Sequence, residues 1–305
     1  MQGICTPTLL APANEPNTLA IDATSIYWAD NAPGGGVAKV ALTGGTPTSL
    51  ASGATNAFAL AIDGTNAYVV SLDPVINADI LSVPLAGGTF TTIATNMYTT
   101  VGTGNLLVTG GNIYWAQASS GAIMSVSAGG GTPATLVSMQ PFPDAIGTDG
   151  SNLYWTVDGN GAVTGEPMAV LSAPLGGNTP STLYSYAPYT GTFSDLAVGP
   201  QDLYWIANGA IQSIPHGGAS SLTPISNTAG GSNPRLPTID GSNIYWAESG
   251  SVTDTILMVP LAGGTPFTIT TGAPRVQSIV IGASCVYWSY YTNLANGGAV
   301  YQVTK

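Results

Sequence analysis

The pattern that decides the fold is Ile-Asp-Gly-Ser-Asn-Ile-Tyr-Trp at residues 239–246, followed by Val-Pro-Leu-Ala-Gly-Gly-Thr-Pro at residues 259–266. The Tyr-Trp pair of this pattern recurs along the chain, and Tyr68-Val69 stands in the one gap. Successive tyrosines lie 40 to 50 residues apart, a spacing typical of propeller blades. The sequence therefore predicts seven repeats, marked by Tyr27, Tyr68, Tyr114, Tyr154, Tyr204, Tyr245 and Tyr287.

Each repeat contains four short apolar segments separated by turn signals, which is the content of one four-stranded blade. The Asp-Gly and Gly-Gly pairs between the segments suit tight hairpins, because glycine adopts positive φ without a Cβ clash. We therefore expect an all-β fold, a seven-bladed propeller that forms a single domain over residues 1–305. Its blades are expected at about residues 17–53, 57–97, 104–139, 143–186, 193–230, 234–272 and 276–305.

The two ends of the chain complement each other. The seventh repeat stops at Lys305 before an outer strand has formed. At the other end, Thr-Pro-Thr-Leu-Leu-Ala at residues 6–11 matches the outer strands that begin at Thr46 and Thr132. We expect residues 6–11 to supply the outer strand of blade seven, which closes the ring without an exposed pairing edge between its first and last blades.

The chain has two cysteines, Cys5 just before the donated strand and Cys285 just before the second strand of blade seven. Both follow turns on the same face of one blade, two strands or about 10 Å apart. We predict a Cys5–Cys285 disulfide, which would link the chain ends and imply an oxidising compartment. The alternative is a pair of free buried thiols.

Charge is scarce in this chain. Charged residues make up 6% of the sequence, and 4 basic residues face 15 acidic ones, for a net charge of −11. Binding to a polyanion needs several basic side chains, so nucleic acid and anionic membrane surfaces are excluded as partners. Every apolar run is far shorter than the about 20 residues of a spanning helix, so we expect no membrane insertion. The uncharged polar surface favours a secreted or cell-surface protein whose signal peptide is absent from this chain.

The Tyr-Trp strand and the Gly-Gly-Thr-Pro turn resemble the YWTD-type propellers of lipoprotein-receptor ectodomains. The signature reads Ile-Tyr-Trp-Ala-Asp at residues 26–30 and Ile-Tyr-Trp-Ala-Glu at residues 244–248. The chain is still more similar to secreted bacterial YWTD-like repeat proteins, often from myxobacteria. The receptor propellers have six blades where this chain counts seven, so the resemblance implies protein or ligand docking but transfers no particular site.

Residues that recur in every blade are explained by the fold. The six tryptophans could form a stacking array for sugars or bases, but their shared position on the second strand favours interblade core packing. An aspartate five residues before the tyrosine could contribute to a carboxylate ring, but at the start of a hairpin it usually caps its own turn amides. These aspartates are Asp22, Asp63, Asp149 and Asp240.

Polar residues that do not recur are better candidates for a site. Asn105, Asp144 and Asp195 precede the inner strands of three consecutive blades, at the expected mouth of the channel. Oxygen ligands that converge on one point are preferred by Ca²⁺, so these residues are candidate calcium ligands. Together with Arg235 they also form the candidate ligand-binding site. The alternative is that Asp195 and Arg235 form a rim ion pair of little energetic consequence.

Two further features bear on function. An isolated histidine, His216, lies at a hairpin on the opposite face from these candidates, and it lacks the partners that a catalytic triad or a zinc site needs. Aromatic residues gather in the connections into blades three to five, where they either edge a ligand patch or pack beneath their own loops. They are Tyr98, Phe142, Tyr186, Tyr189 and Phe193.

The sequence leaves three functions open. The first is a non-enzymatic extracellular propeller that binds a carbohydrate or a protein at the channel face, on the side of blades three to five. The second is a metal-assisted lyase or hydrolase at the channel mouth. The third is a self-assembling structural subunit of a surface layer or filament. No catalytic residues are assigned, because the sequence shows no nucleophile paired with a base.

Overall fold

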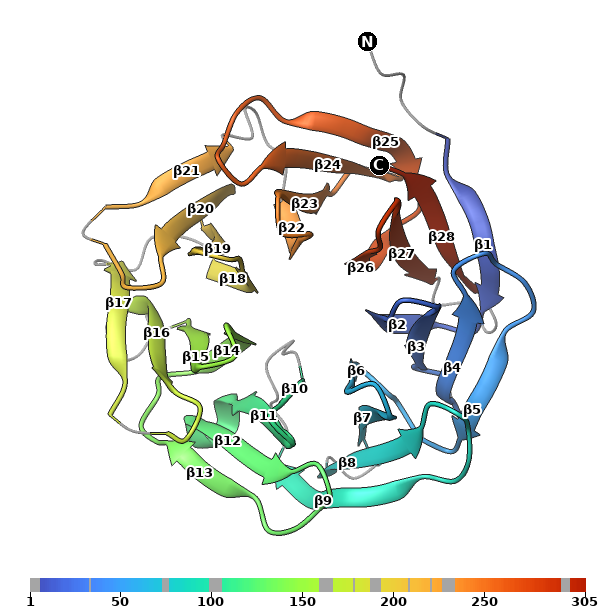
Figure 1. Ribbon diagram of the computed structural model, residues 1–305, viewed down its shortest axis with the longest axis horizontal. Helices are drawn as coiled ribbons and strands as arrows, with labels where there is room; N and C mark the ends of the chain where they lie inside the picture. Colours follow the sequence, from blue (N-terminus) through green and yellow to red (C-terminus); the bar gives the residue numbers. More distant parts are fainter. Residues whose placement is uncertain are drawn as a thin grey trace.

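A computed structural model shows seven four-stranded antiparallel sheets arranged as blades around a central channel (Figure 1). In each blade the strands follow one another from the channel to the rim, and the N-terminal strand completes the last sheet. The predicted fold class is thus confirmed. The structure describes residues 6–32, 34–72, 77–98, 106–158, 167–177, 179–186, 193–207, 209–219, 221–226, 234–291 and 297–305.

The first four blades are formed by sixteen consecutive strands. Blade one comprises β2 (Pro16–Ile21), β3 (Ser25–Asp30), β4 (Gly36–Ala41) and β5 (Thr48–Ser52). Blade two comprises β6 (Ala59–Ile62), β7 (Asn66–Leu72), β8 (Asn77–Pro84) and β9 (Thr91–Tyr98). Blade three comprises β10 (Leu107–Thr109), β11 (Asn112–Gln117), β12 (Ala122–Ser127) and β13 (Ala134–Val137). Blade four comprises β14 (Pro143–Thr148), β15 (Asn152–Val157), β16 (Met168–Pro174) and β17 (Ser181–Tyr186).

The last three blades include the closure of the ring. Blade five comprises β18 (Phe193–Val198), β19 (Asp202–Ala207), β20 (Ala210–Pro215) and β21 (Thr223–Ser226). Blade six comprises β22 (Pro234–Ile239), β23 (Asn243–Glu248), β24 (Asp254–Pro260) and β25 (Phe267–Ala273). Blade seven comprises β26 (Val276–Ile281), β27 (Cys285–Tyr291), β28 (Gly298–Thr304) and β1 (Thr8–Ala13).

The ring is closed by β1, which pairs antiparallel with β28 in a register that runs from Thr8 opposite Gln302 to Ala13 opposite Gly298. Figure 1 shows this N-terminal strand outside the C-terminal strands of the same blade. The strand begins two residues later than residues 6–11 predict, and a bulge lies between Leu9 and Ala11. The predicted closure is confirmed, and it pairs the edge that β28 would otherwise expose.

The ring has two faces, which we name by their loops. The turn face carries the hairpins that join the first strand to the second and the third to the fourth, as residues 22–24 and 42–47 do in blade one. The connection face carries the loops that join the second strand to the third and one blade to the next, as residues 31–35 and 53–58 do. Of the candidate ligand residues predicted above, Asp144, Asp195 and Arg235 lie at the connection-face ends of β14, β18 and β22.

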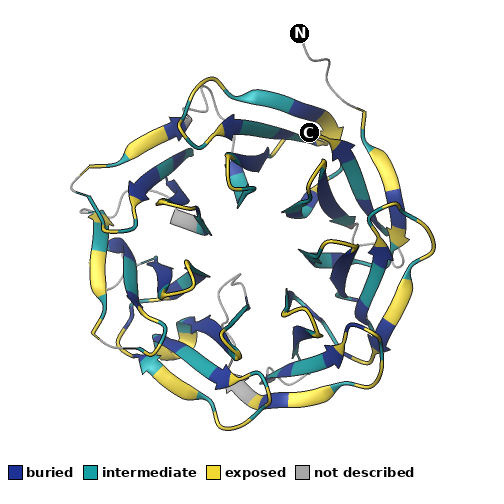
Figure 2. Ribbon diagram, in the orientation of Figure 1, coloured by how far each residue is buried: buried dark blue, intermediate teal, exposed yellow. Residues whose placement is uncertain are grey.

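The hydrophobic core lies in the wedges between adjacent blades. One cluster joins Tyr27 and Val37 of blade one to Leu60 and Val69 of blade two, and the other wedges are built in the same way. Figure 2 shows buried residues on the inner strands and exposed residues along the rim. The six tryptophans are at most 2% exposed, which confirms the predicted packing role.

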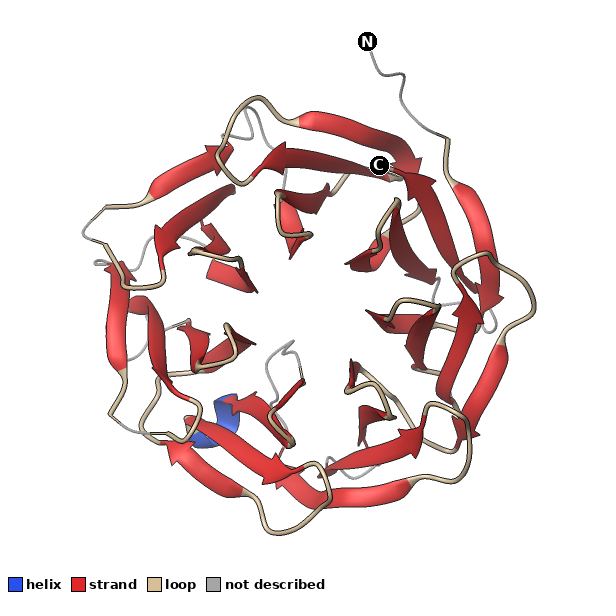
Figure 3. Cartoon of the chain, viewed as in Figure 1, coloured by secondary structure: helices blue, strands red, loops and turns tan. Residues whose placement is uncertain are grey.

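Strands and turns account for almost all of the described chain, as Figure 3 shows. Within the described residues, one 3-10 turn, η1 (Ala118–Ser120), follows β11. None of the helical structure in the described ranges is long and apolar enough to cross a membrane.

Candidate functional site

On the turn face, an aspartate and a tyrosine lock each of four hairpins. In blade two, Oδ1 of Asp63 accepts hydrogen bonds from the backbone N–H groups of Thr65 (2.9 Å) and Asn66 (2.8 Å). Oδ2 of the same carboxylate accepts a hydrogen bond from the Tyr68 hydroxyl at 2.7 Å. Equivalent contacts, within the hairpin and to the tyrosine five residues on, are made by Asp22, Asp149 and Asp240.

These bonds confirm the predicted role in the turn. The tyrosine partner was not foreseen, although the constant spacing of five residues was a signal for it. Burial raises the pKa of Asp63, but hydrogen bonds from Tyr68, Asn66 and Thr65 outweigh this effect and lower the pKa to about 2. Burial and the Asp63 carboxylate together raise the pKa of Tyr68 to about 12. The pair is therefore a fixed carboxylate–phenol contact at neutral pH, with no proton to exchange.

His216 belongs to a position that repeats in every blade. Its backbone N–H donates to the Gln201 carbonyl (3.0 Å), just as Leu85 donates to Thr65 and Lys305 to Ser284 in other blades. The side chain at this position reaches the preceding blade: the rings of His216 and Tyr154 have centroids 5.1 Å apart.

The polar side chains at this position, His216 and Lys305, also lie close to the hairpin aspartate of the preceding blade. Nδ1 of His216 lies 3.7 Å from Oδ2 of Asp149, and Nζ of Lys305 lies 2.8 Å from Oδ2 of Asp240. Leucine occupies the same position in blades one, two, four and six, where it packs beside the tyrosine of the preceding blade. His216 is therefore one variant of an interblade packing contact.

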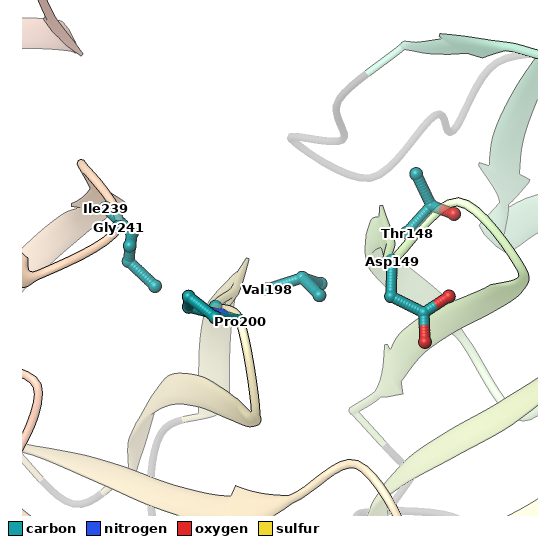
Figure 4. Close-up of a pocket in the computed structure, with 7 residues that line it drawn as sticks. Thr148, Asp149, Val198, Pro200, Ile239 and Gly241 are labelled. Atoms are coloured by element: carbon teal, nitrogen blue, oxygen red, sulfur yellow. The ribbon is translucent and has the colours of Figure 1, made fainter.

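The turn face also carries a hollow of about 370 Å³ at the rim of the channel, beside three blades. Figure 4 shows Val198 and Pro200 of blade five between Asp149 of blade four and Ile239 of blade six. The carboxylate of Asp149 is already engaged by its own hairpin and by Tyr154, and polar and apolar atoms line the hollow about equally. The sequence did not predict this hollow. Its lining is Thr148, Asp149, Val198, Gly199, Pro200, Ile239 and Gly241.

On the connection face, Arg235 clamps blade six to blade seven. Its guanidinium donates to Oδ2 of Asp254, to the Val276 carbonyl and, at 2.9 Å, to the Ser249 hydroxyl. Asp254 is 2% exposed and also accepts the Val276 N–H at 2.7 Å. The ion pair of Arg235 is thus made with Asp254, and the predicted ligand-binding arginine is occupied by contacts within the fold.

The other predicted ligands are only partly placed. Asp195, with a positive φ of 53°, accepts the Leu236 N–H of the next blade at 3.3 Å, and Asp144 is partly buried beside the channel. Asn105 lies outside the described residues. Within the described ranges no three carboxylate, thiol or imidazole side chains group closely enough to hold a metal ion. The calcium site and the metal-assisted reaction stay predictions.

The connection from blade three to blade four, residues 138–142, displays two apolar side chains. Met139 is 90% exposed and Phe142 is 48% exposed. Both have the left-handed backbone conformation, with φ of 57° and 52°. This conformation is uncommon for residues other than glycine and costs of the order of 1 kcal/mol each, so the surrounding structure must impose it.

Gln140 anchors this connection from inside. The side chain is 7% exposed, and its Oε1 accepts the indole N–H of Trp155 at 3.0 Å. Its backbone N–H donates to the Gly121 carbonyl at 2.8 Å, and a Cβ at Gly121 would lie 2.6 Å from the Gln140 carbonyl oxygen. The Phe142 carbonyl accepts the Asp158 N–H at 3.1 Å. The buried glutamine therefore holds the exposed pair on a rigid support.

The aromatic residues in the connections into blades three to five were predicted either to edge a ligand patch or to pack beneath their own loops, and the described residues include one example of each. Phe142 is displayed to solvent, as a ligand patch requires. Tyr186 packs edge-on against Tyr184 with ring centroids 5.0 Å apart, which fits packing beneath its own loop. Tyr189 and the side chains of Tyr98 and Phe193 lie outside the described part of the chain.

The predicted disulfide is not seen. Cys285 has a free, partly buried thiol, and Cys5 lies outside the described residues. The Cys5–Cys285 pairing stays a prediction.

No family model matches the sequence, and none of the curated proteins matches it. Solved structures resemble the fold. A virginiamycin B lyase from Staphylococcus aureus has a TM-score of 0.72 at 13% identity, covering 95% of each chain. The hydrazine synthase of Kuenenia stuttgartiensis has a TM-score of 0.71 at 14% identity, covering 100% of this chain and 99% of the other.

A chain of the nidogen/laminin complex has a TM-score of 0.56 at 17% identity, covering 85% of this chain and 94% of that chain. Identities this low show a shared fold alone. The resemblance to YWTD-type propellers is therefore supported at the level of the fold, which is compatible with a binding role.

Proposed function

We propose that this chain is a non-enzymatic, extracellular binding propeller that recognises a protein partner through its connection face. The observation that carries the proposal is the anchored connection 138–142, which holds Met139 and Phe142 out to solvent. Methionine and aromatic residues are enriched in protein interfaces, whereas charged residues are depleted at the interface core. A loop that presents such residues on a rigid support loses little conformational entropy on binding.

Two further observations support a protein partner. A third exposed apolar side chain, Val252 (78% exposed), lies in the loop between β23 and β24 on the same face. A carbohydrate would need hydrogen-bonding groups next to Phe142, and the thioether of Met139 is a poor one. The location outside the cell is proposed from the charge-poor surface, which uncharged polar residues cover.

The test is photocrosslinking from one position on each face. A photoreactive residue would replace Met139 on the connection face or, as the control, the exposed Ala86 in the turn-face hairpin after β8. Presented to the surface of the source cells, the first variant should crosslink to a defined protein and the second should not. Equal products from both positions would contradict the proposal. A glycan array with the wild-type chain tests the carbohydrate alternative.

A further inference from the structure

The chain offers few bonds to proteases that cut after lysine or arginine. It contains 4 basic residues, of which Lys39, Arg235 and Arg275 lie inside the chain. A protease of this class needs the basic side chain to be free to enter its acidic specificity pocket. It also needs the backbone beside the bond to leave its own hydrogen bonds, which a folded segment does by local opening. The three internal sites differ in how far they meet these two requirements.

Lys39 and Arg235 are held within the fold. Lys39 lies in β4, which is paired on both sides with β3 and β5, and its Nζ donates to the Leu85 carbonyl at 2.6 Å. Arg235 lies in β22, and its guanidinium donates to Asp254 and to the Val276 carbonyl. Neither side chain is free to enter a protease pocket, and the bond that follows each one belongs to a sheet.

Arg275 meets the first requirement, a free side chain. It is exposed in the two-residue connection between β25, which ends at Ala273, and β26, which begins at Val276. Figure 1 shows β25 on the rim of blade six and β26 beside the channel in blade seven. None of the ion pairs among the described residues involves Arg275. Its side chain can therefore enter a protease pocket from solvent.

The bond after Arg275 is protected by the contacts of Val276. Val276 is 0% exposed, its N–H donates to Oδ2 of Asp254 at 2.7 Å, and its carbonyl accepts a hydrogen bond from Arg235. Asp254 is itself paired with Arg235. Because the Val276 nitrogen is the leaving group of the cleavage, it must separate from Asp254 before a protease can bind this bond. The Arg235–Asp254 pair therefore limits how often the site opens.

We propose that Arg275–Val276 is the proteolytic site of this chain, cut by a protease that recognises arginine, and that the Arg235–Asp254 pair controls its exposure. Water breaks the bond between the Arg275 carbonyl carbon and the Val276 nitrogen, giving its hydroxyl to the new carboxyl group and its other hydrogen to the new amine. The cut places β26, β27 and β28 in one fragment, whereas β1, which pairs with β28, stays in the other. Blade seven is then held to the ring by packing and strand pairing alone.

The experiment follows digestion of the folded wild-type chain by trypsin, and reducing gels with intact mass spectrometry identify the fragments. The wild type should be cut slowly, and first after Arg275, into residues 1–275 and 276–305. Asp254→Ala should be cut at the same bond at least about tenfold faster, because the population of the open site rises when Val276 loses its acceptor. Arg275→Gln in the Asp254→Ala background should remove this cut.

Two further variants separate local opening from a general loss of stability. Gln140→Leu removes a buried hydrogen bond in the connection between blades three and four, and its cleavage after Arg275 should stay within about twofold of the wild-type rate. Asp254→Asn keeps an amide oxygen that can accept the Val276 N–H but loses the charge that pairs with Arg235. This milder variant should be cut after Arg275 at a rate between those of the wild type and Asp254→Ala.

A first cut after Lys39 or Arg235 in the wild type would overturn the proposal, as would equal acceleration by Gln140→Leu and Asp254→Ala. Wild-type and Asp254→Asn chains that both stay intact, under conditions in which the urea-unfolded chain is cut, would overturn it as well. Thermal melts establish which variants are folded at the temperature of digestion. If Asp254→Ala is not, Asp254→Asn decides the outcome, and a rate no faster than that of the wild type contradicts the role of the pair.

Discussion

The strand β14 of blade four has one end on each face of the ring, and its two ends use their side chains differently. At the turn-face end, Asp149 bonds its own hairpin and Tyr154, and the same contacts recur in other blades. At the connection-face end, Gln140 is buried while Met139 and Phe142 are displayed, an arrangement found in this connection alone among the described ones.

Carboxyl groups show the same difference. On the turn face, hydrogen bonds hold the pKa of Asp63, Asp149 and Asp240 at about 2. On the connection face, burial raises the pKa of Asp158, and it raises that of Asp30 to about 6. The comparison teaches that the turn face repeats one carboxylate–tyrosine contact in four blades, whereas the connection face combines the Arg235–Asp254 clamp with apolar side chains that remain exposed.

The largest loss of stability is expected at the Arg235–Asp254 contact of the connection face. Asp254→Ala should lower the free energy of unfolding by about 3 kcal/mol, because it leaves the Arg235 guanidinium and the Val276 N–H without their buried acceptor. Urea unfolding measures the loss. Arg275→Met, at an exposed arginine of the next connection, is the control and should change stability by less than about 0.5 kcal/mol.

The second prediction compares the buried Gln140 with the exposed Met139 in their effect on stability. Gln140→Leu should cost about 2 kcal/mol, because the buried indole N–H of Trp155 loses its acceptor. Thermal melts measure this loss. Met139→Asn, one residue away and 90% exposed, should leave the free energy of unfolding nearly unchanged. Similar losses for the two variants would contradict the view that Gln140 stabilises the connection while Met139 contributes little to stability.

On the turn face, removal of the Tyr68 hydroxyl should cause a smaller loss of stability. Tyr68→Phe removes the hydrogen bond to Asp63 and should cost about 1 kcal/mol. Tyr114→Phe is the matched control, because Thr109 occupies the aspartate position of that blade. Equal effects would mean that ring packing, and not the carboxylate–phenol bond, supports this face.

The smallest effects concern pH and have opposite signs on the two faces. Because the folded pKa of Asp63 is lowered to about 2, the stability it contributes is present above its ordinary pKa of 3.8 and is lost as pH falls toward 2. Burial raises the pKa of Asp30 to about 6, a hydrogen bond from Ala32 opposes this, and the Glu15 charge adds to it. The stability that depends on a protonated Asp30 is therefore lost as pH rises through 6.

Asp30→Asn should thus stabilise the chain at pH 7 by less than about 1 kcal/mol after allowance for solvent screening, and should have no effect below pH 4. Asp63→Asn should destabilise at pH 7, with the loss fading as pH falls below 4. Thermal melts of both variants from pH 2 to pH 8 measure the two slopes. Slopes of the same sign would contradict the contrast between the faces.

Much of this molecule could be predicted from repeats. The position of each tryptophan in the interblade core, the capping role of Asp63 and its counterparts, and the strand donated by the N-terminus all follow from spacing. Arg235 could not be placed in the same way, because its partners Asp254 and Val276 lie 19 and 41 residues away and are brought together by the packing of two blades.

The sequence by itself determined the number of blades, their closure and the face on which each loop lies, because hairpin signals and strand alternation act over a few residues and recur seven times. Tertiary structure alone decided which side chains remain exposed. Gln140 and Met139 are neighbours in the chain, yet one is buried against Trp155 and the other faces solvent. That choice depends on backbone conformation and on contacts with a distant strand, which no local pattern encodes.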